Sequence, residues 1–171
     1  YNSFGNCSAM RVSPCGYLCE THNVTKYARE SAECTHNHPE GIKGAECVAR
    51  CIEVALCSRK HQEDGKRFVE EVAEMYGYNT QQTSDEIRRT NTFNETCQVT
   101  VPQAIVCFLE STDFESAIRL AVSIGGDSDT IAAITGSIAE AYYGIPQHIQ
   151  DKAWDYLPKE MQEVVTKFKQ K

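Results

Sequence analysis

The stretch from Ile124 to Thr130 holds the residues of this sequence that are best suited to chemistry. It reads IGGDSDT, so two adjacent glycines precede two acids, Asp127 and Asp129, and a hydroxyl at Thr130. Adjacent glycines let the backbone turn sharply and let a ligand approach closely. Carboxylate and hydroxyl oxygens are the hard donors that Mg²⁺, Mn²⁺ and Ca²⁺ prefer. The stretch therefore predicts a cation site made by Asp127, Asp129 and Thr130.

A helix N-terminus explains the same residues without a metal. The two glycines would end one helix, and Asp127 or Ser128 would cap the next. This explains one acid well, whereas the second gains only a favourable position near the positive end of a helix. An EF-hand is excluded, because Ala132 and Ile138 stand where that loop needs Gly and Glu. Residue chemistry alone leaves the cation site and the helix cap equally open.

Two further polar loops have residues that suit ligand binding. Residues 3–16 include Gly5-Asn6-Cys7-Ser8, whose backbone N–H groups could face a phosphate, with Arg11 as a matching charge. Residues 35–44 read THNHPEGIKG, in which His36 could stack on a ligand or hydrogen-bond it. Zinc is disfavoured, because the two histidines are two apart and lack the H-E-x-x-H pattern. A surface turn and a loop histidine are the simpler alternatives.

The segments between these loops repeat apolar residues at helical spacing. This spacing predicts helices over 41–59, 64–76, 102–110, 113–124, 127–143 and 158–170, and loops over 1–16, 35–44 and 77–101. Pro102 is expected near the first turn of its helix, and Asp113 is expected to cap the helix that follows it. Alternating strand patterns are essentially absent. We therefore expect an all-α fold, a single compact multi-helix domain of six to eight helices.

Composition restricts the partners and the compartment. The 171 residues carry a formal charge of −7, which argues against a nucleic-acid partner, and no apolar run approaches the ~20 residues of a membrane span. Residues 1–60 hold seven Lys and Arg against six Asp and Glu, so this third is best suited to an anionic ligand. The nine cysteines lack zinc-site spacing, and a chain of this length needs no disulfides. We expect buried thiols and a reducing, cytoplasmic location.

Three motifs taken together resemble the ADP-ribosylglycohydrolase family, which includes the dinitrogenase-reductase-activating glycohydrolase. They are GNCSAMRVSP at 5–14, THNHPEGIKGA at 35–45 and GGDSDTIAAITGSIAEAYYG at 125–144. The resemblance covers essentially the whole chain, and the last motif is the most specific. It implies an all-α fold with a dinuclear Mg²⁺ or Mn²⁺ centre. It also implies hydrolysis of the bond between ADP-ribose and a modified side chain or small leaving group.

The resemblance also implies a role for particular residues. Asp127, Asp129 and Thr130 would be metal ligands, with Asp129 a candidate bridge between two ions. The loop from Gly5 to Arg11 would line the diphosphate and the distal ribose, and His36 would lie near the adenosine end. The full set implied to bind substrate is Gly5, Asn6, Cys7, Ser8, Met10, Arg11, His36, Gly125 and Gly126. The catalytic residue stays unknown, as does the leaving group, which could be arginine, serine or a small molecule.

Two departures from the family pattern affect this interpretation. No Thr-Asp-Asp run supplies the other metal ligands, since Thr112-Asp113 is followed by Phe114 and lies after the first loop. Cys7 stands where the family usually has glycine. The chain also opens with Tyr1, so we expect an absent N-terminal segment that would act as a partner and complete the metal site. The alternatives are a catalytically incomplete ADP-ribose-binding module and a purely structural descendant.

Overall fold

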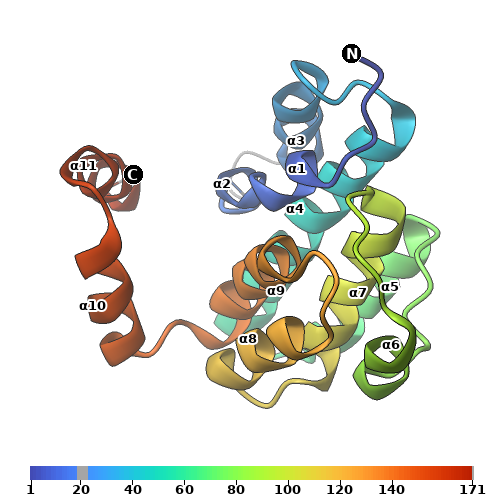
Figure 1. Ribbon diagram of the computed structural model, residues 1–171. Coiled ribbons are helices and arrows are strands. Elements are labelled where there is room, and N and C mark those ends of the chain that lie inside the picture. Colours follow the sequence, from blue (N-terminus) through green and yellow to red (C-terminus); the bar gives the residue numbers. More distant parts are fainter. Residues whose placement is uncertain (19–22, 171) are drawn as a thin grey trace.

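This computed structural model describes residues 1–18 and 23–170, most of which lie in helices. Those residues form eleven helices and no strand, and one isolated bridge pairs Gly5 with Thr96. The predicted all-α fold is confirmed. The helices are α1 (Cys7–Met10), α2 (Ser13–Gly16), α3 (Val24–Glu33), α4 (Pro39–His61), α5 (Gly65–Met75), α6 (Ser84–Thr90), α7 (Cys97–Glu110), α8 (Phe114–Ser123), α9 (Ser128–Tyr143), α10 (Gln147–Tyr156) and α11 (Lys159–Lys169) (Figure 1).

Helix α4 lies at the centre of the helical body and contacts α1, α2, α3, α5, α7 and α9. Pro39 occupies its first turn, and the His38 side chain accepts a hydrogen bond from the backbone N–H of Glu40 at 3.1 Å. Close packing against α7 requires Gly44, since a Cβ there would lie 2.6 Å from the Cys97 sulfur. This central helix fixes the positions of the segments that surround it.

Helix α9 completes the core against α4, α7 and α8. Its residues Ile131, Ile134 and Ile138 are almost completely buried, as their helical spacing predicts. Burying each such side chain contributes about 1.5–3 kcal/mol. The Thr135 hydroxyl donates to the carbonyl of Ala104 in α7 at 2.9 Å, so a buried polar group also holds the two helices together. The start of α9, which carries the acidic residues, is thereby held on a rigid element.

The predicted loops contain more helix than expected, and the described residues form eleven helices rather than six to eight. The expected loop over 1–16 contains α1 and α2, and the expected loop over 77–101 contains α6 and the first turn of α7. Helices α3 and α10 were not predicted. Val24, Ala28 and Ala32 do repeat at helical spacing along α3 and are buried, whereas no residue of α10 is buried. Pro102 lies inside α7 rather than in its first turn. Its ring nitrogen has no hydrogen to donate to the carbonyl one turn earlier.

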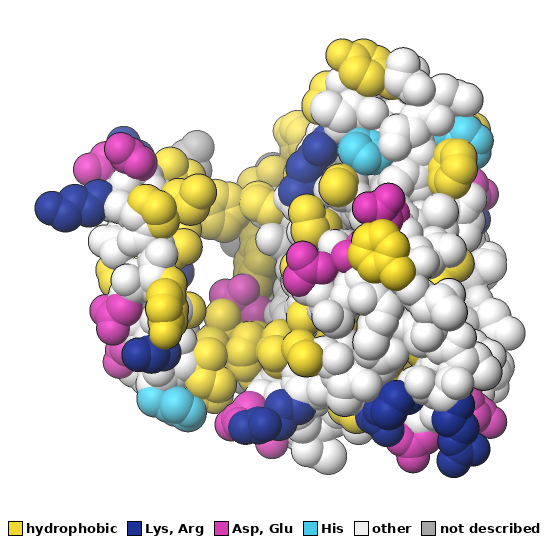
Figure 2. All heavy atoms as spheres, viewed as in Figure 1, with side chains coloured by type: hydrophobic (Ala, Val, Ile, Leu, Met, Phe, Trp, Pro, Cys, Tyr) yellow, Lys and Arg dark blue, Asp and Glu magenta, His cyan; other side chains and the backbone are white. Residues whose placement is uncertain are grey.

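The helix predictions other than that of α7 hold to within two residues at each end. Asp113 caps α8 as predicted, with its carboxylate accepting the backbone N–H of Ser116 at 2.7 Å. The predicted tail helix is confirmed as α11. Helices α10 and α11 lie to one side of the body (Figures 1 and 2). Helix α11 contacts the body through Phe168, whose ring lies edge-on to that of Tyr17 with the ring centres 6.5 Å apart. None of the helices among the described residues is both long enough and apolar enough to cross a membrane.

The cysteines only partly follow the prediction of buried thiols. Cys47, Cys51, Cys97 and Cys107 are completely buried in the core, so the prediction is confirmed for these four. Cys7 and Cys34 are exposed, and for them the prediction is wrong. None of the eight cysteines that the structure describes forms a disulfide with another of them.

Candidate functional site

The acidic stretch forms a tight turn between α8 and α9. Gly125 and Gly126 have φ angles of +71° and +69°, in the left-handed region that disfavours residues with a side chain. Asn91 holds this turn, because its Nδ2 donates to the carbonyls of Ile124 at 3.1 Å and Gly125 at 3.3 Å. A Cβ at Gly126 would lie 2.7 Å from the same nitrogen. The two glycines are therefore required by backbone conformation, and the second also by lack of space.

Asp127 stands at the cap position of α9, but its side chain makes no capping hydrogen bond. It accepts instead from Nδ2 of Asn6, at 2.5 Å. Asn6 is buried, and the same nitrogen donates to Oγ1 of Thr100 at 3.0 Å. The helix-cap alternative therefore fails for the Asp127 side chain. This carboxylate is held by the first polar loop of the sequence.

Asp129 lies in the first turn of α9 and is exposed. A hydrogen bond with the Asp127 side chain, followed by the backbone N–H of Thr130, lowers the pKa of Asp129 below its ordinary value. Both carboxyl groups therefore meet at one point on the surface. The Thr130 side chain is buried and donates to the sulfur of Met10 at 3.5 Å. All three predicted ligands lie together at this corner, with the Thr130 hydroxyl turned inward.

The donors at this corner suit one side of a divalent cation. Two adjacent carboxylates are hard, negatively charged donors, and the N-terminus of α9 leaves them open to solvent. Mg²⁺ and Mn²⁺ prefer six oxygen ligands, some of them water. Within residues 1–18 and 23–170, no group of three His, Cys, Asp or Glu residues is placed to hold a metal ion. The donors present therefore fit part of a coordination shell, and a second ion needs further ligands.

The loop that starts at Gly5 uses several of its polar groups for its own fold. The backbone N–H of Asn6 donates to the carbonyl of Glu95 at 2.7 Å and is not available to a phosphate. The Ser8 hydroxyl is buried and donates to the carbonyl of Gly41 in α4 at 2.8 Å. Cys7 and Met10 are exposed on the same short helix. The solvent-facing part of this loop is therefore formed by Cys7 and Met10, whereas Asn6 and Ser8 hold it in place.

Arg11 and His36 lie on the other side of this loop. Nη2 of Arg11 donates to Oγ1 of Thr35 at 2.5 Å and to the carbonyl of Ser31 at 2.9 Å. The Thr35 hydroxyl lies 2.8 Å from Nδ1 of His36, and a Cβ added to Gly5 would lie 3.3 Å from Nε2. Burial, followed by the charge of Arg11, lowers the pKa of His36, so the ring is neutral at pH 7. The first and second motifs therefore meet at Gly5.

The three motifs share one face of the molecule. Asn6 joins the first motif to the third, and Gly5 joins the first to the second. Figure 2 shows acidic side chains near the centre of this face, with basic and histidine side chains close above them. The face thus brings together negative charge that suits a metal ion and a positive group that suits an anion.

The segment over 91–97, which supports the site, was not singled out in the sequence. Asn91 holds the glycine turn, Glu95 accepts the backbone N–H of Asn6, and Thr96 pairs with Gly5. One local signal was available, because Asn94 Oδ1 accepts both the N–H and the hydroxyl of Thr96, as Asn followed two residues later by Thr often does. The contacts to Gly5 and Asn6 span about 90 positions and leave no such signal.

Comparison with known proteins identifies the family. The family model described as ADP-ribosylglycohydrolase matches residues 1–170. The chain belongs to the ADP-ribosylglycohydrolase family. The predicted resemblance is therefore confirmed, and two of the relatives below are named as an ADP-ribosylhydrolase and an ADP-ribosylarginine hydrolase, which are glycosidases.

Relatives of this ADP-ribosylglycohydrolase chain are about twice its length. ADP-ribosylhydrolase ARH3 of Homo sapiens is 29% identical over 85% of this chain and 52% of its own length. An uncharacterized protein of Archaeoglobus fulgidus is 31% identical over 82% of this chain and 50% of its own length. ADP-ribosylarginine hydrolase Tri1 of Pseudomonas putida is 26% identical over 88% of this chain and 42% of its own length. The chain therefore spans about half the length of the curated relatives that it matches.

A solved structure shares the fold of this ADP-ribosylglycohydrolase chain. It is described as an ADP-ribosylglycohydrolase-related protein complex and superimposes with a TM-score of 0.63 at 27% sequence identity. The match covers 85% of this chain and 53% of the other. The helical arrangement seen here is thus a known arrangement, and it again matches about half of a longer chain.

Proposed function

We propose that this protein is a metal-dependent hydrolase that removes ADP-ribose from a modified protein or a small molecule by cleaving an N- or O-glycosidic bond. The observation that carries the proposal is the 2.5 Å hydrogen bond between Asn6 and Asp127, residues 121 positions apart. It joins the first loop to the acidic turn at a solvent-facing corner. The names of the matched relatives, ADP-ribosylhydrolase and ADP-ribosylarginine hydrolase, support the reaction class.

Asp127 and Asp129 would hold Mg²⁺ or Mn²⁺ in this proposal. Thr130 would supply a third oxygen if its hydroxyl turned from Met10 toward the acids. When bound, the metal supplies a Lewis acid that orients the ribose hydroxyls and the attacking water. The dinuclear centre of the family needs further ligands, which would come from outside the described residues. The Asn6 amide fixes the Asp127 carboxylate beside Asp129, so that the two acids would face the ion together.

The loop from Gly5 to Arg11 would hold the ADP-ribose part of the substrate. Cys7 and Met10 present exposed side chains there, and Arg11 offers a positive charge to the diphosphate. The neutral ring of His36, next to Gly5, would hydrogen-bond or stack at the adenosine end. Gly125 and Gly126 let the substrate approach the turn, because no side chain projects from it.

A second candidate function is an ADP-ribose-binding module without turnover. One observation favours it: Asp127 and Asp129, the two acids of the turn, would both be occupied as metal ligands and could not then deprotonate water. In that case the chain would bind ADP-ribose with its first two motifs and release no product.

One paired measurement tests both candidates. The 171-residue chain is titrated with ADP-ribose in a calorimeter with Mn²⁺, and ADP-ribose release from ADP-ribosylated arginine and serine peptides is followed in parallel. Asp127→Ala is compared with Asp155→Ala, an exposed acid on α10. Binding and release that both require Asp127 support the hydrolase. Binding without release, both in this chain and in a longer protein that supplies the further metal ligands, supports the binding module. Absence of ADP-ribose binding, or equal behaviour of the two variants, contradicts both.

A further inference from the structure

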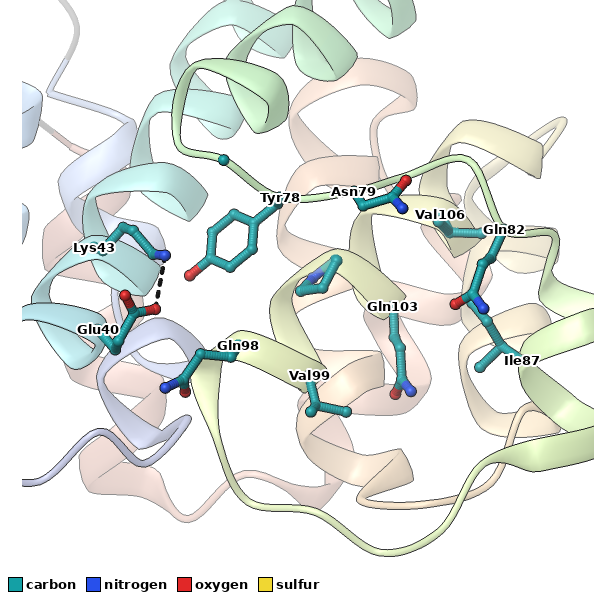
Figure 3. A pocket seen from close by; sticks show the side chains of 12 residues that line it. Glu40, Lys43, Tyr78, Asn79, Gln82, Ile87, Gln98, Val99, Gln103 and Val106 are labelled. Carbon is teal, nitrogen blue, oxygen red and sulfur yellow. Dashed lines mark ion pairs between the residues drawn. The ribbon is translucent and has the colours of Figure 1, made fainter.

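A hollow of about 650 Å³ lies outside the acidic corner, between the start of α4, the segment over 77–82, and helices α6 and α7. This volume is within the range of ordinary ligand sites. Figure 3 shows the hollow from close by. Its lining residues are Glu40, Lys43, Gly77, Tyr78, Asn79, Gln82, Ile87, Gln98, Val99, Pro102, Gln103 and Val106.

The charges in the hollow neutralise each other. Lys43 and Glu40 form an ion pair of 2.7 Å at one end, drawn as a dashed line in Figure 3. The Lys43 ammonium also lies 4.8 Å from the ring centre of Tyr78. No other charged side chain lines the hollow. A charged ligand would therefore have to break this pair, so an uncharged occupant is favoured.

Four carboxamide side chains line the hollow: Asn79, Gln82, Gln98 and Gln103. Gln103 Nε2 donates to Asn91 Oδ1 and Asn79 Oδ1 accepts the backbone N–H of Gln81, both at 2.9 Å, so these two amides keep their remaining groups for an occupant. A carboxamide offers both a donor and an acceptor. Val99, Pro102 and Val106 provide apolar surface along α7 between these amides. The lining thus suits a molecule that alternates hydrogen-bonding groups with apolar parts.

The Tyr78 hydroxyl lacks a hydrogen-bond partner in the structure, although Tyr78 is only 5% exposed. A buried polar group without a partner destabilises a fold, so it calls for an explanation. In Figure 3 the hydroxyl points toward the end of the hollow where Glu40, Lys43 and Gln98 lie. Gln98 is exposed and can turn aside. An occupant at this end would then supply the partner that Tyr78 lacks.

We propose that this hollow binds an extended, uncharged segment of another polypeptide. Peptide groups alternate N–H and C=O along a chain, which the carboxamides can match, and residues 78–83, which border the hollow, belong to no helix or strand. A sugar or a nucleobase usually needs an aromatic face on which to stack. The one aromatic ring here, that of Tyr78, already has Lys43 over it. The proposal does not depend on ADP-ribose hydrolysis.

The test is a nuclear magnetic resonance titration of the full 171-residue chain labelled with ¹⁵N. The probes are a pool of capped hexapeptides of Gly, Ser, Thr, Asn and Val, a matched pool that includes Asp and Glu, and adenosine. The neutral pool should give saturable shifts of the Gln98, Gln103 and Asn79 side-chain amides. Saturable shifts with adenosine alone, tighter binding of the acidic pool, or no saturable shift with any probe would overturn the proposal.

Tyr78→Phe checks the role of the unpartnered hydroxyl, with Tyr156→Phe on α10 as the matched control. Because Tyr78→Phe removes one hydrogen bond to the occupant, its affinity for the neutral peptide pool should fall about fivefold, whereas the affinity of the Tyr156→Phe control should not change. The denaturation midpoint of Tyr78→Phe should not fall, because the hydroxyl has no partner to lose. A lower midpoint with unchanged peptide affinity would show that the hydroxyl serves the fold instead.

Discussion

The side-chain amide of Asn6 and the carboxylate of Asp127 lie 2.5 Å apart, although 121 positions separate them in the chain. The same amide also donates to Thr100 in α7, so one buried side chain joins three segments. Charge-assisted hydrogen bonds of this kind are stronger than those between neutral groups. Asn6 therefore acts as a positioning residue for the acidic turn and as a structural link between α7 and α9.

Replacing Asn6 by alanine should lower the free energy of unfolding by about 1–3 kcal/mol. The hydrogen bonds to Asp127 and Thr100 are both lost, and the buried Thr100 hydroxyl loses one of its hydrogen-bond partners. Urea denaturation measures the change. Asn37→Ala, which alters an exposed asparagine, should shift the free energy by no more than about 0.5 kcal/mol. Equal effects of the two variants would contradict the structural role of Asn6.

The two glycines of the turn should differ in their response to alanine. Both have positive φ, so each substitution carries a backbone cost of about 1–2 kcal/mol. Gly125→Ala meets nothing within 4 Å, whereas Gly126→Ala places a Cβ 2.7 Å from Asn91 and disturbs its hydrogen bonds. Gly126→Ala should therefore be the more destabilising change. Thermal unfolding of the pair checks this, and an equal loss would mean that Asn91 moves freely.

The periodic apolar segments were predictable because burial follows from spacing, as it does for Ile131, Ile134 and Ile138. The capping residue Asp113 was predictable because its chemistry is local. Helix α6 also had a local signal that was not used: Thr83 and Glu86 form a capping box. Local rules thus determine where most helices begin and end.

The assembly of the site was less predictable, because it depends on contacts between distant segments. The residue types at Asp127 and Asp129 indicated a cation site, but a helix cap explained them equally well. Only the contact with Asn6 distinguishes the two, and hydrophobic periodicity carries no information about it. Ser8 was predicted to face a ligand, but its hydroxyl is buried and donates to the carbonyl of Gly41 instead. Spacing predicts helices, whereas long-range hydrogen bonds decide which polar groups face a ligand.

The chain alone should bind Mn²⁺ weakly, with a dissociation constant above about 0.1 mM, because two carboxylates and water leave the ion poorly neutralised. Calorimetry measures the affinity. Asp127→Ala and Asp129→Ala should each weaken binding further, and Asp155→Ala should not. Removing the metal with EDTA should leave the melting temperature almost unchanged, since weak binding adds little stability. Binding that survives both substitutions at the turn would place the metal elsewhere.

The thiols should divide into two classes by accessibility. Cys7 and Cys34 are exposed and should react with iodoacetamide in the native chain at pH 8. The thiols of Cys97 and Cys107 are completely buried and should react only after unfolding. Mass spectrometry of peptides from the labelled chain distinguishes the two classes, and freshly purified protein should contain no disulfide. A specific disulfide in that protein would overturn the prediction of a reducing compartment.

The stability of the fold should decrease as the pH rises above about 9. Burial raises the pKa of Cys97 to about 11 and that of Cys107 to about 12, from an ordinary value of 9.0. Below pH 9 both thiols are protonated in the folded and the unfolded chain, so their contribution to stability is fully present. Between pH 9 and about pH 12 the unfolded chain loses these protons first, which favours unfolding.

Melting temperatures measured with reductant at pH 8, 9, 10 and 11 should therefore fall with increasing slope. Cys107→Ala should start from a lower melting temperature, because it leaves a cavity, but should show a shallower decline. An unchanged slope in that variant would mean that the Cys107 thiol does not cause the alkaline loss of stability.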